Sequence, residues 1–365
     1  MRNNDNYPVF LVGVRCMTYN HHAYIEDAMN GFTMQQTTFP FVCAIIDDAS
    51  TDGEPDVILR YMNDHFDLAP ESGARQWETD EARFLYAHHR QNPNCYFGIV
   101  LLKTNYYSQH KSKEHLMTQW LSDVKYYALC EGDDYWIDPQ KLQIQVDYLE
   151  NNRDCTITFS FVNIVDSNGD FINKQIPPRN CVQGDKVVTL SDYVGLEFGK
   201  SIWAFQTSSY VFRKEMMVEY RKIQPIVFNT IHCGDMPLVL TSLLNGNGFV
   251  IKDFFSCYRW GVGVLSSKRD YSEDIKFQLD IIDSFLNFDT FTNYNYSKSI
   301  YKRVKNIFLS LIWEGKHEKV LYNKMIFQSI LNARNKWKIL SFYIFIKYIL
   351  FYFYKFKSYF RKIFH

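Results

Sequence analysis

Three carboxylates stand almost side by side where an apolar stretch ends, in the segment "ALCEGDDYW". They are Glu131, Asp133 and Asp134. Like charges this close repel one another, and a carboxylate beside a buried strand is costly unless something compensates it. The hard cations Mg²⁺ and Mn²⁺ favour carboxylate oxygen and complete their coordination with water and substrate phosphates. The segment therefore predicts a cation site with few protein ligands, suited to a diphosphate, and the simpler alternative is a solvated acidic turn.

Two other segments place acidic residues at positions where chemistry is possible. Asp47 and Asp48 end the apolar run of "IIDDASTDG", where a carboxylate can accept a hydrogen bond from the ring N–H of uracil or thymine. Asp235 precedes a helical apolar pattern in "IHCGDMPLVL". It is suited to cap that helix, or to act as a general base that takes a proton from an acceptor hydroxyl.

The elements that must position these residues alternate along the first half of the chain. Strand-like apolar runs, separated by helical patterns, are "VFLVGVRC", "FVCAIIDD", "YFGIVLLK" and "VKYYALC". This alternation predicts βαβ units and a Rossmann-like, mainly parallel sheet flanked by helices. Polar residues follow three of the runs, and ligands bind beyond the carboxyl ends of parallel strands. We therefore expect one crevice to collect the three polar segments.

The rest of the chain divides into a second stretch of mixed pattern and a helical region. Residues 71–94 are polar and lack clear periodicity, so they predict an insertion or a long loop. Strand-like and helical segments follow as far as residue 268. Helical patterning dominates after that, so we expect a catalytic domain over 1–268 and a helical C-terminal region over 269–365.

Composition indicates a globular protein that stays inside the cell. The chain has 365 residues, of which 47% are hydrophobic and 22% are charged, enough for one large domain with an appendage or for two domains. Its eight cysteines form no CxxC pair and are expected to be reduced thiols. The apolar N-terminal stretch is interrupted by Arg15, which favours a first strand over a signal peptide. We expect a cytoplasmic protein that does not bind nucleic acid.

The tail, residues 336–365, differs in charge from the rest of the chain. It contains seven Lys or Arg and no Asp or Glu, while the remaining residues carry 33 basic against 40 acidic side chains. A membrane span is disfavoured because Lys347 interrupts the apolar stretch. A helix packed on the catalytic domain is one alternative. The other is a helix lying on an anionic membrane surface, with aromatic residues at the acyl boundary and cations at the headgroups.

Five segments together resemble a known family. They are "CMTYNHHAYIEDAMNGFTMQQTTFPFVCAIIDDASTDG", "TNYYSQ", "YYALCEGDDYWIDPQKLQIQVDYLE", "WAFQTSSYVFRK" and "HCGDMPLVL". In this order they resemble the family 2 inverting glycosyltransferases with a GT-A fold, especially the bacterial branch that builds surface polysaccharide. The resemblance runs, with gaps, from about Val9 to Ser267.

The resemblance implies roles for particular residues. The positions that match the nucleotide-sugar pocket are Thr18, Tyr19, Asp48, Asn105 and Asp133, with Asp48 on the pyrimidine base of a UDP- or dTDP-linked donor. Asp134 matches the ligand of the metal, Mn²⁺ or Mg²⁺, and Asp235 matches the acidic residue proposed as the base. The implied acceptor is a glycan or a lipid-linked glycan.

The sequence departs from the family pattern near the end of the predicted catalytic domain. Where the family has "YRxHxGG", this chain has "YRWGVGV", so Gly261 replaces a common histidine. If that histidine assists the departing diphosphate, this chain must use another group, for which Arg259 is the candidate.

Two rival functions remain beside glycosyl transfer. Nucleotidyl transfer would produce a sugar nucleotide, but such enzymes commonly have a glycine-rich N-terminal loop, and "GVRCMTYN" has a single glycine. A catalytically degenerate nucleotide-sugar-binding or scaffold protein of the same fold is suggested by the missing histidine. Donor hydrolysis with Mn²⁺ separates them, because pyrophosphate release indicates the first and binding without turnover indicates the second.

Overall fold

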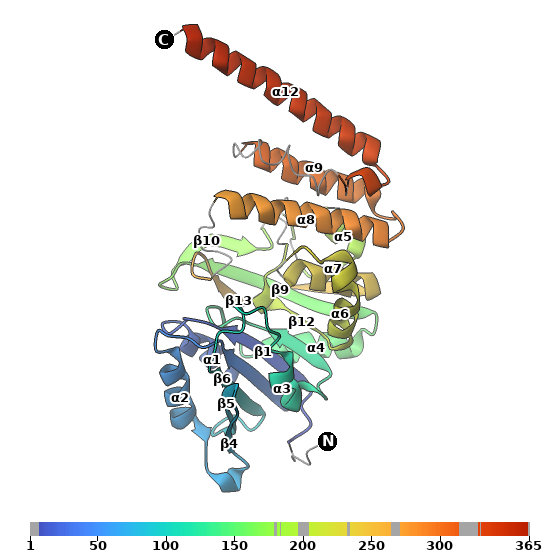
Figure 1. Ribbon diagram of the computed structural model, residues 1–365. Helices are drawn as coiled ribbons and strands as arrows, with labels where there is room; N and C mark the ends of the chain where they lie inside the picture. The colour runs from blue at the N-terminus through green and yellow to red at the C-terminus, as the bar shows by residue number, and fades with distance from the viewer. Residues whose placement is uncertain are drawn as a thin grey trace. The chain divides into compact units, whose positions relative to one another are not determined.

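The structure is a computed structural model that describes residues 7–178, 181–182, 184–195, 204–231, 234–263, 271–313, 328 and 330–363. The chain forms two compact units. Unit 1 comprises Met1–Thr189, Trp203–Val218 and Leu238–Ser267, and unit 2 comprises Leu190–Ile202, Glu219–Pro237 and Lys268–His365. Figure 1 shows the elements of both units along the chain.

Four parallel strands form the centre of the sheet in unit 1. They lie in the order β7 (Tyr126–Leu129), β1 (Val12–Thr18), β2 (Phe41–Asp47) and β6 (Cys95–Leu102). Every residue of β2 is buried, as expected for a parallel strand that is covered on both faces. The expected Rossmann-like, mainly parallel core flanked by helices is confirmed.

Further strands extend the sheet on both sides to 13 strands within the described ranges. On the β7 side lie β12 (Val211–Arg213), β9 (Cys155–Val165), β13 (Asn247–Arg259) and β11 (Lys186–Val188), with β10 (Phe171–Ile176) paired to β9 and β8 (Tyr135–Trp136) paired to β13. β12 runs antiparallel to β7 and β9, whereas β9 and β13 are parallel.

Helices cover the two faces of the central strands. α1 (Ile25–Thr33), α2 (Glu54–His65) and α4 (Lys141–Asn151) share one apolar cluster with the inward side chains of β1, β2 and β6. α3 (Glu114–Leu121) lies on the opposite face, where a Cβ atom at Gly98 of β6 would meet the Trp120 ring at 2.4 Å. A glycine at this position therefore lets the indole pack directly on the strand.

Residues 71–94 are not the long loop that their polarity predicts. After β3 (Phe66–Asp67) and a short 3₁₀ helix (Pro70–Ser72), they contain β4 (Arg75–Glu78) and β5 (Ala82–His89). β5 is antiparallel to β6 and to β4, so the central sheet supplies its backbone partners. β4 alternates between half-buried and exposed residues, which leaves too little apolar periodicity for sequence analysis to detect.

A buried carboxylate joins the loops that follow β1 and β2. Glu54, the first residue of α2, is fully buried. Its Oε1 accepts a hydrogen bond from the Thr18 hydroxyl, and its Oε2 accepts one from the His21 N–H at 2.8 Å and one from the Ser50 hydroxyl at 2.9 Å. Thr18 and Asp47 also face each other in the β1–β2 register, so both loops begin at the same edge of the sheet.

Helices make up most of the described part of unit 2. They are α5 (Leu190–Val194), α8 (Tyr271–Phe291), α9 (Ser297–Trp313) and α12 (Lys336–Ile363), while α6 (Glu215–Val227) and α7 (Asp235–Asn245) have residues in both units. Arg303 of α9 is buried, donates to the Tyr193 carbonyl of α5, and lies 5.0 Å from the ring centroid of Phe285 in α8. Within the described residues, no helix is long and apolar enough to cross a bilayer.

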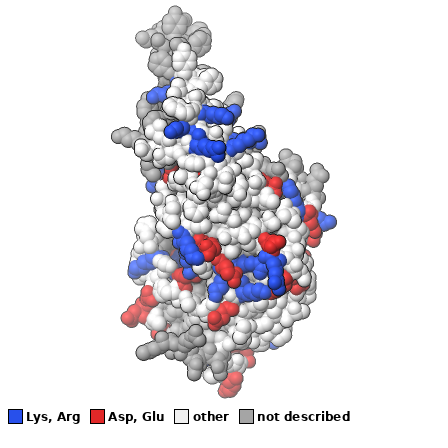
Figure 2. All heavy atoms as spheres, turned by 90° about the vertical axis from the view of Figure 1, so that its right-hand side faces the viewer, with Lys and Arg blue, Asp and Glu red and all other residues white. Residues whose placement is uncertain are grey.

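Basic side chains are concentrated in α9 and α12. In the view of Figure 2, the lower surface carries blue and red side chains together, whereas blue side chains predominate on the helical part that includes α9 and α12. Neither the segment 297–313 nor the segment 336–363 contains an Asp or a Glu. The basic character of the tail therefore extends to α9.

Lys141, the first residue of α4, is a cation buried in unit 1. Its Nζ donates to Gln145 Oε1 at 2.5 Å and lies 4.5 Å from the ring centroid of Trp136. Burial lowers the pKa of Lys141 from its ordinary value to about 7.

The pKa of Lys141 predicts how stability changes with pH. Above about pH 7 the folded chain releases the Lys141 proton while the unfolded chain keeps it, so this lysine makes the unfolding free energy rise with pH. We expect Lys141→Met to remove this rise. The unfolding free energy of the variant minus that of the wild type should therefore fall by up to about 1.4 kcal/mol for each pH unit above pH 7. Urea unfolding near pH 7 and near pH 9 measures this, and an unchanged difference would contradict it.

The Glu54 contacts predict the cost of replacing this carboxylate. In Glu54→Gln an amide N–H₂ would face groups that are themselves donors, so we expect the unfolding free energy to fall by about 1–3 kcal/mol. Glu26→Gln is the control, because Glu26 pairs with Arg60 at 3.2 Å on the surface with both side chains more than half exposed. Its change should stay within about 0.5 kcal/mol, and equal losses in the two variants would count against the role of Glu54.

Candidate active site

The acidic turn after β7 packs closely against the end of β1. The Gly132 N–H donates to the Met17 carbonyl at 3.0 Å, and a Cβ atom at residue 132 would lie 2.1 Å from Thr18 Oγ1. A side chain here would therefore collide with β1, which explains the glycine between the carboxylates. Asp133 and Asp134 are both buried beyond this contact.

Asp134 is surrounded by protein. Its Oδ1 accepts the Arg259 backbone N–H at 3.1 Å, and its Oδ2 accepts the Gln206 side-chain amide at 3.1 Å. Burial, followed by repulsion from Asp133, raises the pKa of the Asp134 carboxyl well above its usual value. A cation near this group would favour its ionised form.

Arg259, at the end of β13, holds the backbone of the acidic turn. Its guanidinium donates to the Asp133 carbonyl at 2.7 Å and pairs with the carboxylate of Asp27 on α1. It lies between two aromatic rings, 4.8 Å from the Tyr24 centroid and 4.6 Å from the Tyr135 centroid. The arginine is thus a buried support of the turn, and its contact with a nucleotide sugar stays a prediction.

His21 faces Asp133 from the loop after β1. Its Nε2 lies 3.8 Å from Asp133 Oδ2, and its Nδ1 lies 3.1 Å from Thr18 Oγ1. The Thr18 hydroxyl donates its proton to Glu54, so it must accept a hydrogen bond from His21 Nδ1–H. The Thr18 hydroxyl therefore links the His21 ring to the buried Glu54 carboxylate.

Asp48 organises the segment that contains Asn105. Its Oδ1 accepts the Tyr106 N–H at 2.7 Å, and its Oδ2 accepts the Tyr107 N–H at 3.0 Å. The Lys113 ammonium also lies 2.6 Å from Asp48 Oδ2, and Asn105 Nδ2 donates to the Asp48 carbonyl at 2.9 Å. Asp48 and Asn105 are therefore brought together, while their contacts with a nucleotide base or ribose stay predictions.

The carboxylates create a negative environment at this edge of the sheet. Burial raises the pKa of the Cys16 thiol on β1, and the nearby carboxylates that raise it further are Glu131, Glu54, Asp133 and Asp134. Burial also raises the pKa of Asp47 to about 6, although Ser50 N–H donates to its Oδ2 at 3.2 Å. The buried Asp47 Oδ1 has no hydrogen-bond partner in the described structure. This environment favours a cation.

The donor set suits a divalent cation that takes few ligands from the protein. No group of three or more His, Cys, Asp and Glu side chains that could hold a metal occurs among the described residues. Mg²⁺ and Mn²⁺ fit such a site, because they accept one or two carboxylates and complete their shell with water and phosphate oxygens. Asp134 and Asp133 supply hard oxygen donors of the required type.

The remaining predicted residues have different surroundings. Tyr19 is 38% exposed beside buried Thr18. Asp235 is the first residue of α7 and belongs to unit 2, so its role as a base stays a prediction. Gly261 has φ of 86°, a left-handed conformation that strains any residue with a Cβ atom. A histidine would be disfavoured at this backbone position.

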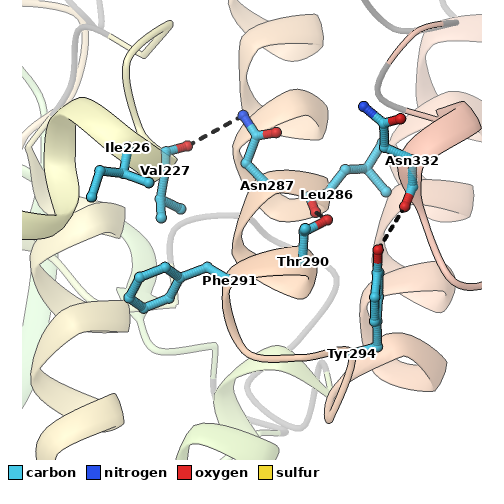
Figure 3. Close-up of a pocket in the computed structure, with 8 residues that line it drawn as sticks. All are labelled: Ile226, Val227, Leu286, Asn287, Thr290, Phe291, Tyr294 and Asn332. Carbon is cyan, nitrogen blue, oxygen red and sulfur yellow. Dashed lines mark hydrogen bonds between the residues drawn. The ribbon is translucent and has the colours of Figure 1, made fainter.

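A separate pocket in unit 2 is shown in Figure 3. It is lined by Ile226, Val227, Leu286, Asn287, Thr290, Phe291, Tyr294 and Asn332. Several of its polar groups already bond within the protein, since Asn287 donates to the Val227 carbonyl and the Tyr294 hydroxyl to the Asn332 carbonyl. Its lining residues include no carboxylate and no histidine.

Sequence analysis did not identify four residues that shape the site. They are Glu54, His21, Lys113 and Gln206. Of these, Glu54 could have been predicted from the segment "TDGE". A glutamate at the beginning of a helix can accept hydrogen bonds from the polar loop that precedes it. Lys113 and Gln206 lie far along the chain from the aspartates they contact, so no local pattern could indicate them.

Sequence comparison finds distant relatives. No family model matches the chain. Uncharacterized proteins from Mycobacterium tuberculosis and Mycobacterium bovis are 34% identical over 153 residues, which is 42% of this chain. The match covers 35% of those proteins, so the chain spans about a third of their length. An uncharacterized glycosyltransferase from Methanocaldococcus jannaschii is 38% identical over 55 residues, or 15% of this chain and 19% of that protein.

Comparison with solved structures concerns the fold. Residues 1–349 of S. aureus TarS match 89% of this chain and 80% of TarS, with a TM-score of 0.51 and 13% identity. The same region of TarS solved with UDP gives a TM-score of 0.51 at 14% identity, covering 89% of this chain and 81% of that one. The mannosyltransferase PcManGT from Pyrobaculum calidifontis, with GDP-Man and Mn²⁺, reaches a TM-score of only 0.44. The fold is therefore glycosyltransferase-like, of the GT-A type.

Proposed function

We propose that this protein is an inverting glycosyltransferase of the family 2 type. It transfers a sugar from a UDP- or dTDP-linked donor to a hydroxyl of a glycan or lipid-linked acceptor during surface polysaccharide assembly. The observation that supports this is the meeting of three polar segments at the carboxyl edge of the central sheet. These segments contain Thr18, Asp48 and the Asp133–Asp134 pair.

The donor occupies this edge in the proposal. Asp48 and Asn105 hold the segment that faces the base, and Asp48 is the candidate acceptor for the N3–H of a uracil or thymine ring. Thr18 and Tyr19 border the same pocket, and Asp133 lies toward the ribose or sugar. UDP is bound in a TarS structure of similar fold, which supports a nucleotide-sugar donor.

A divalent cation, Mn²⁺ or Mg²⁺, is proposed at Asp134. When bound, it neutralises charge on the nucleoside diphosphate as the diphosphate departs. The burial of Asp134 beside Asp133 supports this assignment, because a nearby cation would offset the repulsion between the two carboxylates. Arg259 keeps the turn in place and Gln206 orients one carboxylate oxygen of Asp134.

Asp235 is the proposed general base. Its carboxylate removes the proton from the acceptor hydroxyl while that oxygen forms a bond to the anomeric carbon and the bond to the diphosphate breaks. A single displacement of this kind inverts the anomeric configuration and needs no covalent nucleophile. With Gly261 in place of a histidine, Arg259 is the group proposed to assist the departing diphosphate, because its guanidinium lies against the acidic turn.

The proposed location is the cytoplasmic face of a membrane, where the protein binds peripherally. Lipid-linked acceptors are found there, and the basic aromatic segment 336–365 has the composition of a surface-bound helix. This location would bring acceptor and donor together without a membrane span.

Asp134→Asn tests the activity and the cation together. The amide has nearly the volume of the carboxylate without its charge, so we expect the fold to persist and Mn²⁺-dependent donor hydrolysis to fall by about 10²-fold or more. Hydrolysis is measured over a panel of nucleotide sugars, with Asp80→Asn as the control because Asp80 is exposed. Unchanged turnover and unchanged metal dependence would overturn the assignment of Asp134. Donor binding by the wild type without any turnover would favour the degenerate binding protein instead.

Asp235→Asn tests the general base. Loss of a base costs about 10²–10⁴-fold in rate, so we expect transfer to fall by that amount with little change in donor affinity. Isothermal titration of UDP and a transfer assay measure the two effects, and Asp253→Asn, an exposed aspartate, is the control. A collapse of UDP affinity would identify Asp235 as a donor contact or a helix cap rather than the base.

A further inference from the structure

We propose that α9 and α12 together form a docking surface for an anionic lipid bilayer. The surface, called the tail face here, comprises exposed side chains of α12 and the lysines of α9 beside them. On α12 these are Trp337, Ile344, Phe345, Tyr348 and Ile349, which are between 48% and 71% exposed. The inference specifies the surface behind the proposed membrane location. It rests on the proposed function only in taking the lipid-linked acceptor to be at the membrane.

The tail face lies on the side of α12 opposite the side that packs on α9. Ile339, Tyr343 and Ile346 are buried and recur every three or four residues, so they share one side of the helix. The Tyr343 ring packs edge-on against Phe308 of α9, with the ring centroids 6.4 Å apart. At about 100° per residue, Trp337 and Ile344 fall on the opposite side.

α9 contributes lysines, and one of them lies against α12. Lys298, Lys302 and Lys305 are spaced four and three residues apart and so share one side of α9, which is exposed or half-buried. The Lys305 Nζ lies 5.4 Å from the ring centroid of Phe342 on α12, which shows that the two helices are adjacent at this point. Lys336 and Lys338, both exposed, add two more cations at the beginning of α12.

The chemistry of this surface selects the bilayer over other occupants. A bilayer surface accepts aromatic and aliphatic side chains at its acyl boundary while anionic headgroups take the lysines around them. A second copy of the chain would bring its own lysines against these, at a cost in repulsion, because no carboxylate occurs in either helix to pair with them. The α12 face combines Trp and Tyr with a basic rim, the pattern of an interfacial helix.

The experiment uses the full-length protein and sedimented vesicles. Vesicles of phosphatidylcholine with phosphatidylserine are compared with vesicles of phosphatidylcholine alone, at low and at high salt. The charge variant is Lys298→Gln/Lys302→Gln/Lys336→Gln/Lys338→Gln, and the apolar variant is Trp337→Ser/Phe345→Ser. The matched control is Phe171→Ser/Lys174→Gln on β10, which removes an aromatic ring that is 67% exposed and an exposed lysine elsewhere.

We expect the wild type and the control to bind the anionic vesicles, and binding to weaken as salt rises. Each cation near an anionic surface contributes about a fivefold gain in affinity, so the charge variant should lose about 10²-fold or more. The apolar variant should lose binding at low salt while keeping its thermal unfolding midpoint, because both side chains are exposed.

Three results would overturn the proposal. They are equal binding to both kinds of vesicle, equal binding by the control and the charge variant, and a wild type that ignores vesicles but forms a dimer that Trp337→Ser/Phe345→Ser disrupts. The last would assign the face to self-association. Donor hydrolysis measured without vesicles is independent of these outcomes, so failure of the docking surface and failure of the proposed activity are distinguishable.

Discussion

The structure of the site depends on the cost of removing carboxylates from water. Glu54, Asp47, Asp48 and Asp134 are all buried at the carboxyl edge of the central strands. A buried carboxylate is tolerated when donors or cations surround it, and Glu54, Asp48 and Asp134 recruit such partners from other parts of the chain. Glu54 collects donors from two loops, Asp48 collects two backbone amides and a lysine, and Asp134 collects an amide from each of two segments.

These requirements hold the loops at this edge of the sheet in fixed relative positions. The loops after β1 and β2 cannot move apart without exposing or orphaning Glu54, and the 105–113 segment cannot leave Asp48 without leaving that charge unpaired. The compensation at Asp134 is less complete, because its two hydrogen bonds do not prevent its pKa from rising. The cation is proposed at this edge of the sheet, where the charges of Asp134 and Asp47 are incompletely compensated.

Two helices of unit 2 are basic, in contrast to the acidic edge of the central sheet. These helices, α9 and α12, carry lysines without carboxylates, and an apolar side of α12 remains exposed beside them. Among the described contacts, α9 covers one side of α12. Complete burial of the aromatic residues of α12 would need a second packing partner on the other side. The buried carboxylates at the edge of the central sheet and the basic, apolar face of α12 are therefore chemically distinct surfaces of the chain.

The alternation of apolar runs and helical patterns was sufficient to predict the parallel centre of the sheet. It also predicted the meeting of the segments after Thr18, Asp47 and Leu129, because the carboxyl ends of parallel strands meet at one edge. The strands β4 and β5 were missed because their pairing with β6, rather than their own periodicity, stabilises them. The partners of the buried carboxylates, such as Lys113 for Asp48, and the exposed side of α12 were decided by the tertiary structure. Apolar residues occur all round α12, so its sequence does not show which side is buried. A charged side chain pairs with a group that is near it in space, so its partner cannot be predicted from neighbouring residues in the sequence.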